Sequence, residues 1–157
     1  MSKRVFSLFL VDVLLALERI SRFLAHCDDP EILYRDEMRY PAVLKQFEIV
    51  GEALRYLVDE PALAHAKDSS WRAAMALRNI IVHEYFGVNY RELFRIVVHD
   101  VPKFSKSFEK ICEELKDDPQ MKRALETTRV ELSLVGHLES ARYIQKLEDR
   151  FYGKSKR

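Results

Sequence analysis

Three side chains that can act on a phosphodiester fall within eight residues of one another, in the segment 77–87. They are Arg78, His83 and Tyr85. Histidine titrates nearest neutral pH and can pass a proton in either direction, and arginine offers a planar fork of donors that fits phosphate oxygens. An arginine and a histidine together are the minimal equipment for cleaving a phosphodiester without a metal, because RNA supplies its own nucleophile, the 2′-hydroxyl.

The spacing of these residues does not place them all on one helical face. Arg78 and His83 are separated by about 140° around an ideal helix and by roughly 7.5 Å along it, whereas Arg78 and Tyr85 nearly share a face. The pair can meet on one phosphate if Arg78 reaches around, if the helix unwinds before Gly87, or if two chains contribute. We favour the last two together, because a twofold dimer places two copies of the segment face to face. The plain alternative is a surface arginine and a helix-terminal histidine favoured by the helix dipole.

Metal and cofactor sites are not expected. Glu48 and Glu52 lie four residues apart and could flank a cleft, but no E-x-x-H pattern accompanies them, so a di-metal site is improbable. His83-Glu84 lacks the second histidine of a zinc-protease motif, and no Gly-rich phosphate loop is present. We therefore expect the chain to work with no metal and no cofactor.

Three further residues near the segment could contact a nucleic acid. Asn79 could donate to the same phosphate as Arg78, or could simply be exposed on the helix. Trp71 and Phe86 could stack on bases, although packing in the core is the expected fate of each.

The composition indicates one all-helical domain. The 157 residues include 48% hydrophobic and 32% charged side chains, a balance that argues against a disordered chain and a membrane bundle. Only 4 glycines and 5 prolines are present, too few for the turns of a β-sandwich or barrel. The net charge of +1 creates no strong overall field that would attract nucleic acid, although a local basic patch could still do so.

Two features bear on the compartment. Cys27 and Cys112 have no motif spacing, which fits a reducing compartment better than a disulfide scaffold. A basic pair precedes an apolar run at 5–17, but Asp12 interrupts the run and no signal-cleavage site follows. The run is also short for a bilayer and suits a buried core helix. We expect a cytoplasmic protein without membrane association.

Apolar residues recur at helical spacing between the prolines and predict a series of core helices. The first covers residues 5–26. A polar connection at 27–40 leads to the second helix, at 42–59. Gly51 lies inside this second helix, where it costs about 1 kcal/mol relative to alanine, and close packing of a neighbouring helix would explain it.

The remaining core helices have start signals. The third begins after 68–70, whose side chains offer N-cap oxygens. The fourth begins at Asn89, which forms a capping-box pattern with Glu92. It continues to Leu115 along a heptad-like apolar seam. Because the seam stays in phase past Pro102, we expect a kink there and no stop.

The segment 77–87 resembles the R-x4-H-x-Y signature of the HepT-like toxins, the HEPN half of HEPN/MNT toxin–antitoxin pairs. Here it reads R-NIIV-H-E-Y, followed by FGV. Three more stretches are similar to the family: 47–53, Trp71-Arg72 upstream of the motif, and the acidic-apolar-proline step at 100–102. The likeness covers about residues 8 to 115, and the combination is far more specific than R-x4-H alone.

This resemblance implies an antiparallel four-helix-type HEPN bundle that forms homodimers with a cleft between the protomers. Arg78 and His83 match the family's catalytic pair for metal-independent RNA cleavage. Tyr85 matches the tyrosine that the partner nucleotidyltransferase (MNT) antitoxin modifies with AMP. The implied partners are an RNA substrate, a second copy of the chain and the antitoxin, with higher assembly left open.

Physical chemistry agrees with these implied roles. His83 would act as general base or acid at the 2′-hydroxyl or the leaving 5′-oxygen, and Arg78 would stabilise charge on the phosphate oxygens. The product would be an RNA strand ending in a 2′,3′-cyclic phosphate. AMP on Tyr85 would place bulk and negative charge where the RNA phosphate must lie.

The chain departs from the family after the fourth helix. We divide it into a HEPN bundle at 1–116 and a C-terminal helical extension of the same domain at 117–157. Residues 122–157 hold nine basic and five acidic side chains, a net of +4, which fits RNA, although a solvated amphipathic helix is the plainer explanation. The apolar stripe predicts one extra C-terminal helix that bends near Gly136.

Two other functions stay open. The chain could be a non-catalytic helical binding subunit of a nucleotidyltransferase. It could also be a purely structural dimerisation protein, which would account for the apolar seam but not for the cluster of Arg78, His83 and Tyr85. The intact cluster favours the ribonuclease.

Overall fold

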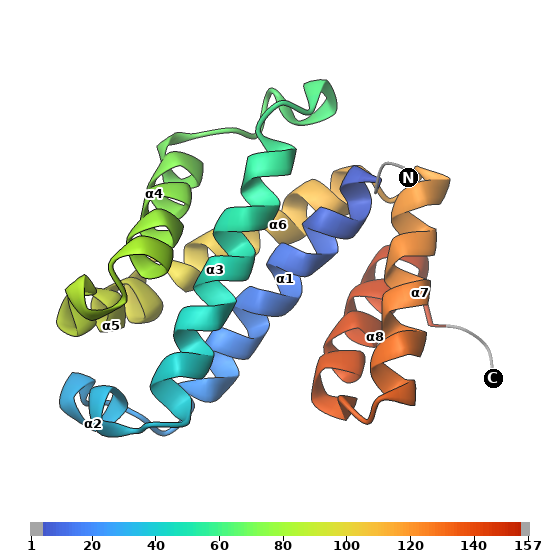
Figure 1. Ribbon diagram of the computed structural model, residues 1–157. Helices are drawn as coiled ribbons and strands as arrows, with labels where there is room; N and C mark the ends of the chain where they lie inside the picture. The colour runs from blue at the N-terminus through green and yellow to red at the C-terminus, as the bar shows by residue number, and fades with distance from the viewer. Residues whose placement is uncertain (1–4, 155–157) are drawn as a thin grey trace.

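The computed structural model describes residues 5–154, and within that range the chain is helical with connecting turns and no strand (Figure 1). The all-α class expected from the composition is confirmed. The elements in chain order are α1 (Phe6–Phe23), α2 (Pro30–Arg35), α3 (Arg39–Leu57), a 3-10 turn (Pro61–Leu63), α4 (Ser69–His83), a second 3-10 turn (Tyr85–Gly87), α5 (Tyr90–His99), α6 (Val101–Glu114), α7 (Pro119–Leu134) and α8 (Leu138–Tyr152).

Helix α1 lies at the centre of the molecule. Nine of its 18 residues are buried, among them Leu10, Leu14 and Leu17. Helix α3 runs alongside α1 in the opposite direction, α6 crosses behind both, and α4 packs on the far side of α3 (Figure 1). The helices predicted at 5–26 and 42–59 are therefore confirmed as α1 and α3. None of the helices in the described part of the chain is long and apolar enough to cross a membrane.

The polar connection predicted between the first two helices is wrong in part, because it contains helix α2. Asp29 caps this helix by accepting a hydrogen bond from the Glu31 N–H at 2.7 Å, and Pro30 occupies the first turn, where a missing N–H costs nothing. Tyr34 of α2 stacks on Tyr90 of α5, with 4.3 Å between ring centroids. Helix α2 thus joins α3 to α5 at one end of the bundle.

The N-caps predicted for the third and fourth helices are confirmed. Asp68 accepts a hydrogen bond from the Ser70 N–H at 2.8 Å at the start of α4. Asn89 accepts one from the Glu92 N–H at 3.1 Å at the start of α5. The Glu92 carboxylate does not complete a capping box, because it binds the guanidinium of Arg95.

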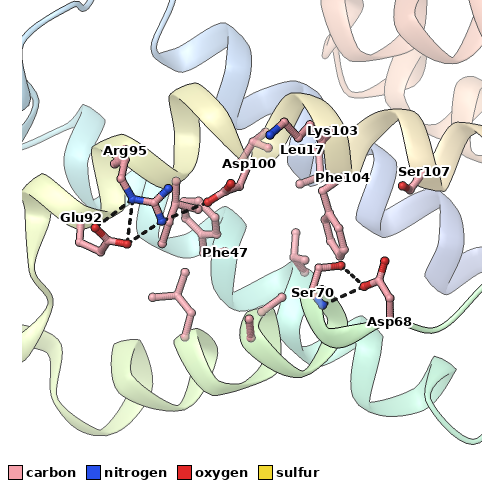
Figure 2. Close-up of a pocket in the computed structure, with 16 residues that line it drawn as sticks. Leu17, Phe47, Asp68, Ser70, Glu92, Arg95, Asp100, Lys103, Phe104 and Ser107 are labelled. Carbon is pink, nitrogen blue, oxygen red and sulfur yellow. Dashed lines mark hydrogen bonds and ion pairs between the residues drawn. The ribbon is translucent and has the colours of Figure 1, made fainter.

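The prediction of one helix with a kink at Pro102 and no stop is wrong in part, because α5 ends at His99 and α6 begins at Val101. Asp100 at the break keeps helical dihedral angles, φ −96° and ψ −39°. Arg95 spans the break, with its Nη2 2.6 Å from Glu92 and 3.2 Å from Asp100 (Figure 2). The apolar seam is buried or half-buried on both sides, so the two helices pack as one bent element.

The C-terminal residues form a hairpin of two helices, α7 and α8, and the prediction of one bent helix is wrong. Gly136 adopts φ +78°, a left-handed conformation that ends α7 and reverses the chain. Both helices pack against α1 on the side away from α4, where Leu125 and Ile144 are fully buried (Figure 1). Val135 and Leu138, the apolar residues on either side of the reversal, are exposed at the turn.

Candidate active site

Helix α4 carries the candidate residues and is anchored in the core near both ends. Trp71 is 2% exposed and stacks on Phe108 of α6, with 5.2 Å between ring centroids. Ile81 is buried close to the other end. His83 is the last helical residue, and Glu84 leaves helical geometry with φ −134° and ψ 51°. The R-x4-H segment therefore lies at the end of a firmly held helix.

Arg78 lies between α4 and α3, where two polar groups hold its guanidinium. Its Nη2 is 2.9 Å from Oε2 of Glu52 on α3, and its Nη1 donates to Oδ1 of Asn79 at 3.3 Å. The side chain is 17% exposed, and its Nε–H is buried without a hydrogen-bond partner among the described residues. The remaining N–H groups of the guanidinium are the donors that a phosphate could use.

Gly51 lets α4 approach α3 at the position of Arg78. A Cβ on Gly51 would lie 2.2 Å from the Cβ of Arg78, 2.8 Å from its Cγ and 3.1 Å from the carbonyl oxygen of Ala74. No side chain fits there. The prediction that close helix packing explains this glycine is confirmed, and the packed residue is the candidate catalytic arginine.

Asn79 and His83 share the exposed face of α4. Residues 72, 76, 79 and 83 recur at helical spacing, and all four are exposed. Asn79 lies one turn before His83, and its Oδ1 accepts the hydrogen bond from Arg78. Asn79 therefore connects the buried edge of the helix, where Arg78 packs, with the solvent face that bears His83.

The structure tests the three arrangements in which Arg78 and His83 could contact one phosphate. Helix α4 does end before Gly87, as expected, but it stays regular from Arg78 through His83. Their separation of about 140° around the helix therefore persists, and unwinding alone does not bring the pair together. The contact between Arg78 and Asn79 directs the guanidinium toward the face of His83. The contribution of a second chain stays a prediction.

Tyr85 and Phe86 lie in the 3-10 turn after α4, and both are exposed to solvent. Tyr85 is 43% exposed and Phe86 is 99% exposed, and their rings meet edge-on with 5.5 Å between centroids. The expectation of core packing is thus confirmed for Trp71 and wrong for Phe86. A phenyl ring that contributes nothing to the core is available to stack on a base or a partner.

A tyrosine of α3 lies within electrostatic reach of Tyr85. Burial, with Tyr34 and Tyr85 nearby, raises the pKa of Tyr40 to about 12. Tyr34 meets Tyr40 edge-on, with 5.3 Å between ring centroids. Tyr40 therefore stays an uncharged hydroxyl at neutral pH and well above it.

Glu52 is the site residue whose role the sequence did not reveal. The pattern of the chain pairs it with Glu48 as the flank of a cleft, and both do line a hollow of about 190 Å³. Its carboxylate, however, binds Arg78 and also Arg55, the latter at 3.3 Å. The available signal was Gly51, its neighbour, which marks the place where α4 comes closest. Across residues 5–154, no group of three or more His, Cys, Asp or Glu is placed to hold a metal ion.

A hollow of about 460 Å³ lies between α4 and the bent α5–α6 element (Figure 2). Apolar side chains such as Phe47 and Phe104 line it together with the charged Arg95. Neither Arg78 nor His83 lines this hollow. The candidate chemistry is therefore on a different part of the surface.

Known proteins resemble this chain across the helices that carry the site. A family described as ribonuclease HepT-like matches residues 13–111. A protein of Methanocaldococcus jannaschii with a provisional RNase name is 38% identical over 109 residues, which cover 69% of this chain and 98% of that protein. A protein of Thermococcus cleftensis provisionally named ribonuclease HepT is 30% identical over 109 residues, which cover 69% of this chain and 97% of that protein. No solved structure gives a significant match.

The family match begins within α1 and ends within α6, so the hairpin of α7 and α8 falls outside it. Arg78, His83 and Tyr85 all fall inside it. The resemblance drawn from the R-x4-H-x-Y motif is thereby confirmed, and this chain belongs to the HepT-like ribonuclease family.

Proposed function

We propose that this protein is a metal-independent endoribonuclease that cleaves RNA with Arg78 and His83. Membership of a ribonuclease family supports RNA as the substrate. The observation that carries the choice of residues is the position of the Arg78 guanidinium, which lies between Glu52 and Asn79 and reaches toward the exposed face of His83. A fixed cation beside a titratable imidazole suits the cleavage of a phosphodiester.

The proposed reaction uses the 2′-hydroxyl of RNA as nucleophile. A neutral His83 imidazole takes the hydroxyl proton while the 2′-oxygen attacks the adjacent phosphorus. The O2′–P bond forms and the P–O5′ bond breaks, and a protonated imidazole gives a proton to the leaving 5′-oxygen. In a dimer the two copies of His83 can divide these tasks. The products are one strand ending in a 2′,3′-cyclic phosphate and one beginning with a 5′-hydroxyl.

Arg78 and Asn79 are the proposed phosphate contacts. The guanidinium would stabilise the charge that builds on the non-bridging oxygens, and loss of one such donor typically costs about 10²–10³ in rate. Because Oδ1 of Asn79 accepts from Arg78, its Nδ2 group is left to donate to a phosphate oxygen. Glu52 acts through Arg78, since it fixes the guanidinium in place before RNA arrives.

The proposed active form is a homodimer. Within one chain, Arg78 and His83 stay about 140° apart around α4. Apolar side chains beside them are exposed, Ile80 by 43% and Val82 by 42%. A second copy that covers them in a twofold contact would carry its own His83 toward Arg78. Light scattering on the purified protein measures the mass, and full activity from a monomer would contradict this arrangement.

The proposed biological role is that of the toxin in a toxin–antitoxin pair, with Tyr85 as the residue that a nucleotidyltransferase antitoxin modifies with AMP. The exposure of Tyr85 leaves its hydroxyl within reach of a modifying enzyme. A nucleotide on this hydroxyl adds bulk and a negative charge that repels the RNA phosphate. Mass spectrometry after co-expression with the nucleotidyltransferase should find one AMP on the parent and none on Tyr85→Phe.

We assign residues 1–116 to the HEPN bundle and residues 117–157 to an extension of the same domain. Helices α7 and α8 pack directly on α1, and buried side chains such as Leu125 and Ile144 belong to the same hydrophobic cluster as the bundle core. A chain cut after residue 116 should therefore unfold at a lower temperature than the full chain, because one face of α1 becomes exposed.

The deciding experiment is cleavage of end-labelled RNA by the purified protein in EDTA. The parent should leave cyclic phosphate ends, and His83→Ala should be slower by about 10²–10⁴. His99→Ala is the matched control, because His99 is likewise an exposed histidine in the last position of a helix. Cleavage by His83→Ala at the rate of the parent would contradict the assignment.

The alternative function is a non-catalytic helical subunit that binds a nucleotidyltransferase. The fully exposed ring of Phe86 beside Tyr85 is the observation that favours it, since such a ring suits a protein contact as well as a base. Failure of an unmodified, dimeric parent to cleave varied RNA would favour this second function.

A further inference from the structure

The C-terminal hairpin and the end of α1 border a third hollow, of about 530 Å³, which is open to solvent. Arg19 and Arg22 of α1 line it together with His137 and Ser140 from the start of α8, and Gln46 of α3 contributes a further wall. The volume is within the range of sites for small molecules, about 300–1,000 Å³. The hairpin lies beyond residue 111, so the family match covers the α1 and α3 walls of this hollow but not the wall that the hairpin supplies.

Two guanidinium groups converge on one buried hydroxyl in this hollow. Ser140 is 1% exposed, and its Oγ accepts hydrogen bonds from Nε of Arg19 and Nη2 of Arg22, both at 3.2 Å. Nη2 of Arg19 also lies 3.4 Å from Nδ1 of His137. These contacts hold two cations side by side across the boundary between α1 and the hairpin.

The two arginines at the hollow differ in how closely a carboxylate approaches them. Glu18 neutralises Arg22 at 2.9 Å, and Glu139 is paired with Arg142 at 2.5 Å. Among the described residues, no carboxylate forms an ion pair with Arg19. Burial lowers the pKa of the Arg19 guanidinium below its ordinary value, so the fold holds this cation at a cost. Glu18 and Asp12 offset part of that cost through space, and an anion in direct contact with the guanidinium would offset more of it.

Two other polar groups at the hollow are left unsatisfied. Helix α8 begins at Leu138 without a side-chain cap from His137, and the Glu139 carboxylate of its first turn is paired with Arg142, so the N–H groups of that turn remain available to an anion. Gln46 is 8% exposed, and its Oε1 has no hydrogen-bond partner within residues 5–154. This oxygen only accepts hydrogen bonds, so the group that satisfies it is a hydroxyl or amino group of a bound nucleotide and not a phosphate oxygen.

We propose that Arg19, Arg22 and the first turn of α8 form a second binding site, which takes the phosphate group of a nucleotide or of an RNA strand. Arginine forks bind phosphate oxygens in a bidentate manner, and a helix N-terminus adds N–H donors directed at the same anion. The net charge of +4 over residues 122–157 also favours a negatively charged ligand.

The site shares no residue with the Arg78–His83 centre. It is defined by binding and not by cleavage, so its test stands whether or not the protein cuts RNA. An RNA strand held here would be tethered to the molecule independently of the scissile phosphate, and a nucleotide held here would join the hairpin to the bundle.

Isothermal titration of the full chain with inorganic phosphate and with 5′-AMP tests the proposal. Arg19→Gln should weaken binding of both by about tenfold or more, the loss of a charge-assisted contact. Arg123→Gln is the matched control, because it removes the same charge from an exposed position on α7 outside the hollow. Equal binding by the parent and Arg19→Gln, or no saturable binding by the parent, would overturn the proposal.

A second measurement identifies the source of the phosphate. Short single-stranded RNA is titrated by fluorescence anisotropy against His83→Ala, which removes cleavage, with and without Arg19→Gln. If the site takes RNA, Arg19→Gln lowers the affinity and reduces the salt slope by about 0.7 per lost phosphate contact. If RNA affinity is unchanged while 5′-AMP binding is lost, the site takes a free nucleotide. Arg22→Gln, whose parent side chain is 38% exposed, replaces Arg19→Gln if that variant melts early.

Discussion

Helices α1 and α4 are of similar length, 18 and 15 residues, but they relate to the core in opposite ways. Nine residues of α1 are buried, whereas only Trp71 and Ile81 are buried in α4. Packing therefore accounts for the apolar side chains of α1, whereas Asn79 and His83 of α4 are exposed and have no packing role that requires their chemistry. Residue types that the core does not require are the ones free to act on a substrate.

The largest expected effect is a loss of stability when a core residue of α1 is truncated, compared with an exposed residue of α4. Leu14→Ala on α1 removes a fully buried side chain and should lower the free energy of unfolding by about 2–5 kcal/mol. His83→Ala on α4 should change it by no more than about 0.5 kcal/mol, because His83 is exposed. Urea unfolding followed by circular dichroism measures both. If the two variants lose similar stability, the contrast between α1 as a core helix and α4 as the helix that carries the site is wrong.

Gly51→Ala should destabilise the protein by about 1–3 kcal/mol, although alanine is the better helix former. The added Cβ would lie 2.2 Å from the Cβ of Arg78, and both atoms are fixed to their backbones, so α3 and α4 must move apart. Arg78 would move with α4, and cleavage per folded molecule should fall too. Urea unfolding and the RNA cleavage assay measure the two effects.

The exchange variant Gly51→Ala/Arg78→Gly serves as the control for that prediction. It removes the Cβ–Cβ conflict and should recover part of the stability lost by Gly51→Ala, while cleavage stays abolished. If Gly51→Ala alone is as stable as the parent, the close approach of the two helices does not constrain Arg78.

Phe86→Ala should leave stability unchanged, because the ring is 99% exposed, but should weaken RNA binding. The stacking of one base on an aromatic ring contributes about 1–3 kcal/mol, so the affinity of catalytically silent His83→Ala protein for RNA should fall at least several-fold. Phe86→Trp keeps the platform and should keep the affinity. Unchanged RNA binding by Phe86→Ala would direct attention to a protein contact at this ring.

Much of the fold can be predicted from local sequence pattern, and each wrong prediction has a physical cause. The 3.6-residue period predicts α1 and α3, and capping residues predict the starts of α4 and α5. Helix α2 is too short for a periodic signal, although Asp29-Pro30 is a recognisable start. The hairpin escapes prediction because the reversal depends on the positive φ of Gly136, which the spacing of apolar residues does not encode.

The candidate site likewise contains residues that the sequence identifies and contacts that only the folded structure reveals. Arg78, His83 and Tyr85 are neighbours in the sequence, so one segment is enough to bring them to attention. Glu52 reaches Arg78 from another helix, and only the packing of α3 on α4 establishes that pair. The exposure of Phe86 is likewise a property of the folded chain, since its apolar character alone predicts burial.

The smallest expected effect concerns the ion pair that links the two helices. Glu52→Gln keeps an oxygen that can accept from Arg78 but removes the carboxylate that competes with RNA for the guanidinium. Exposed pairs contribute about 0.2–1 kcal/mol, so the KM for RNA should fall by up to about fivefold while kcat stays close to that of the parent. Glu52→Ala removes the anchor as well as the charge, so kcat should fall because Arg78 is no longer held in place. This split between KM and kcat is a readout that a purely structural ion pair would not produce. A higher KM in Glu52→Gln would mean that the carboxylate assists RNA binding, and Arg78 would then not be the group that meets the phosphate.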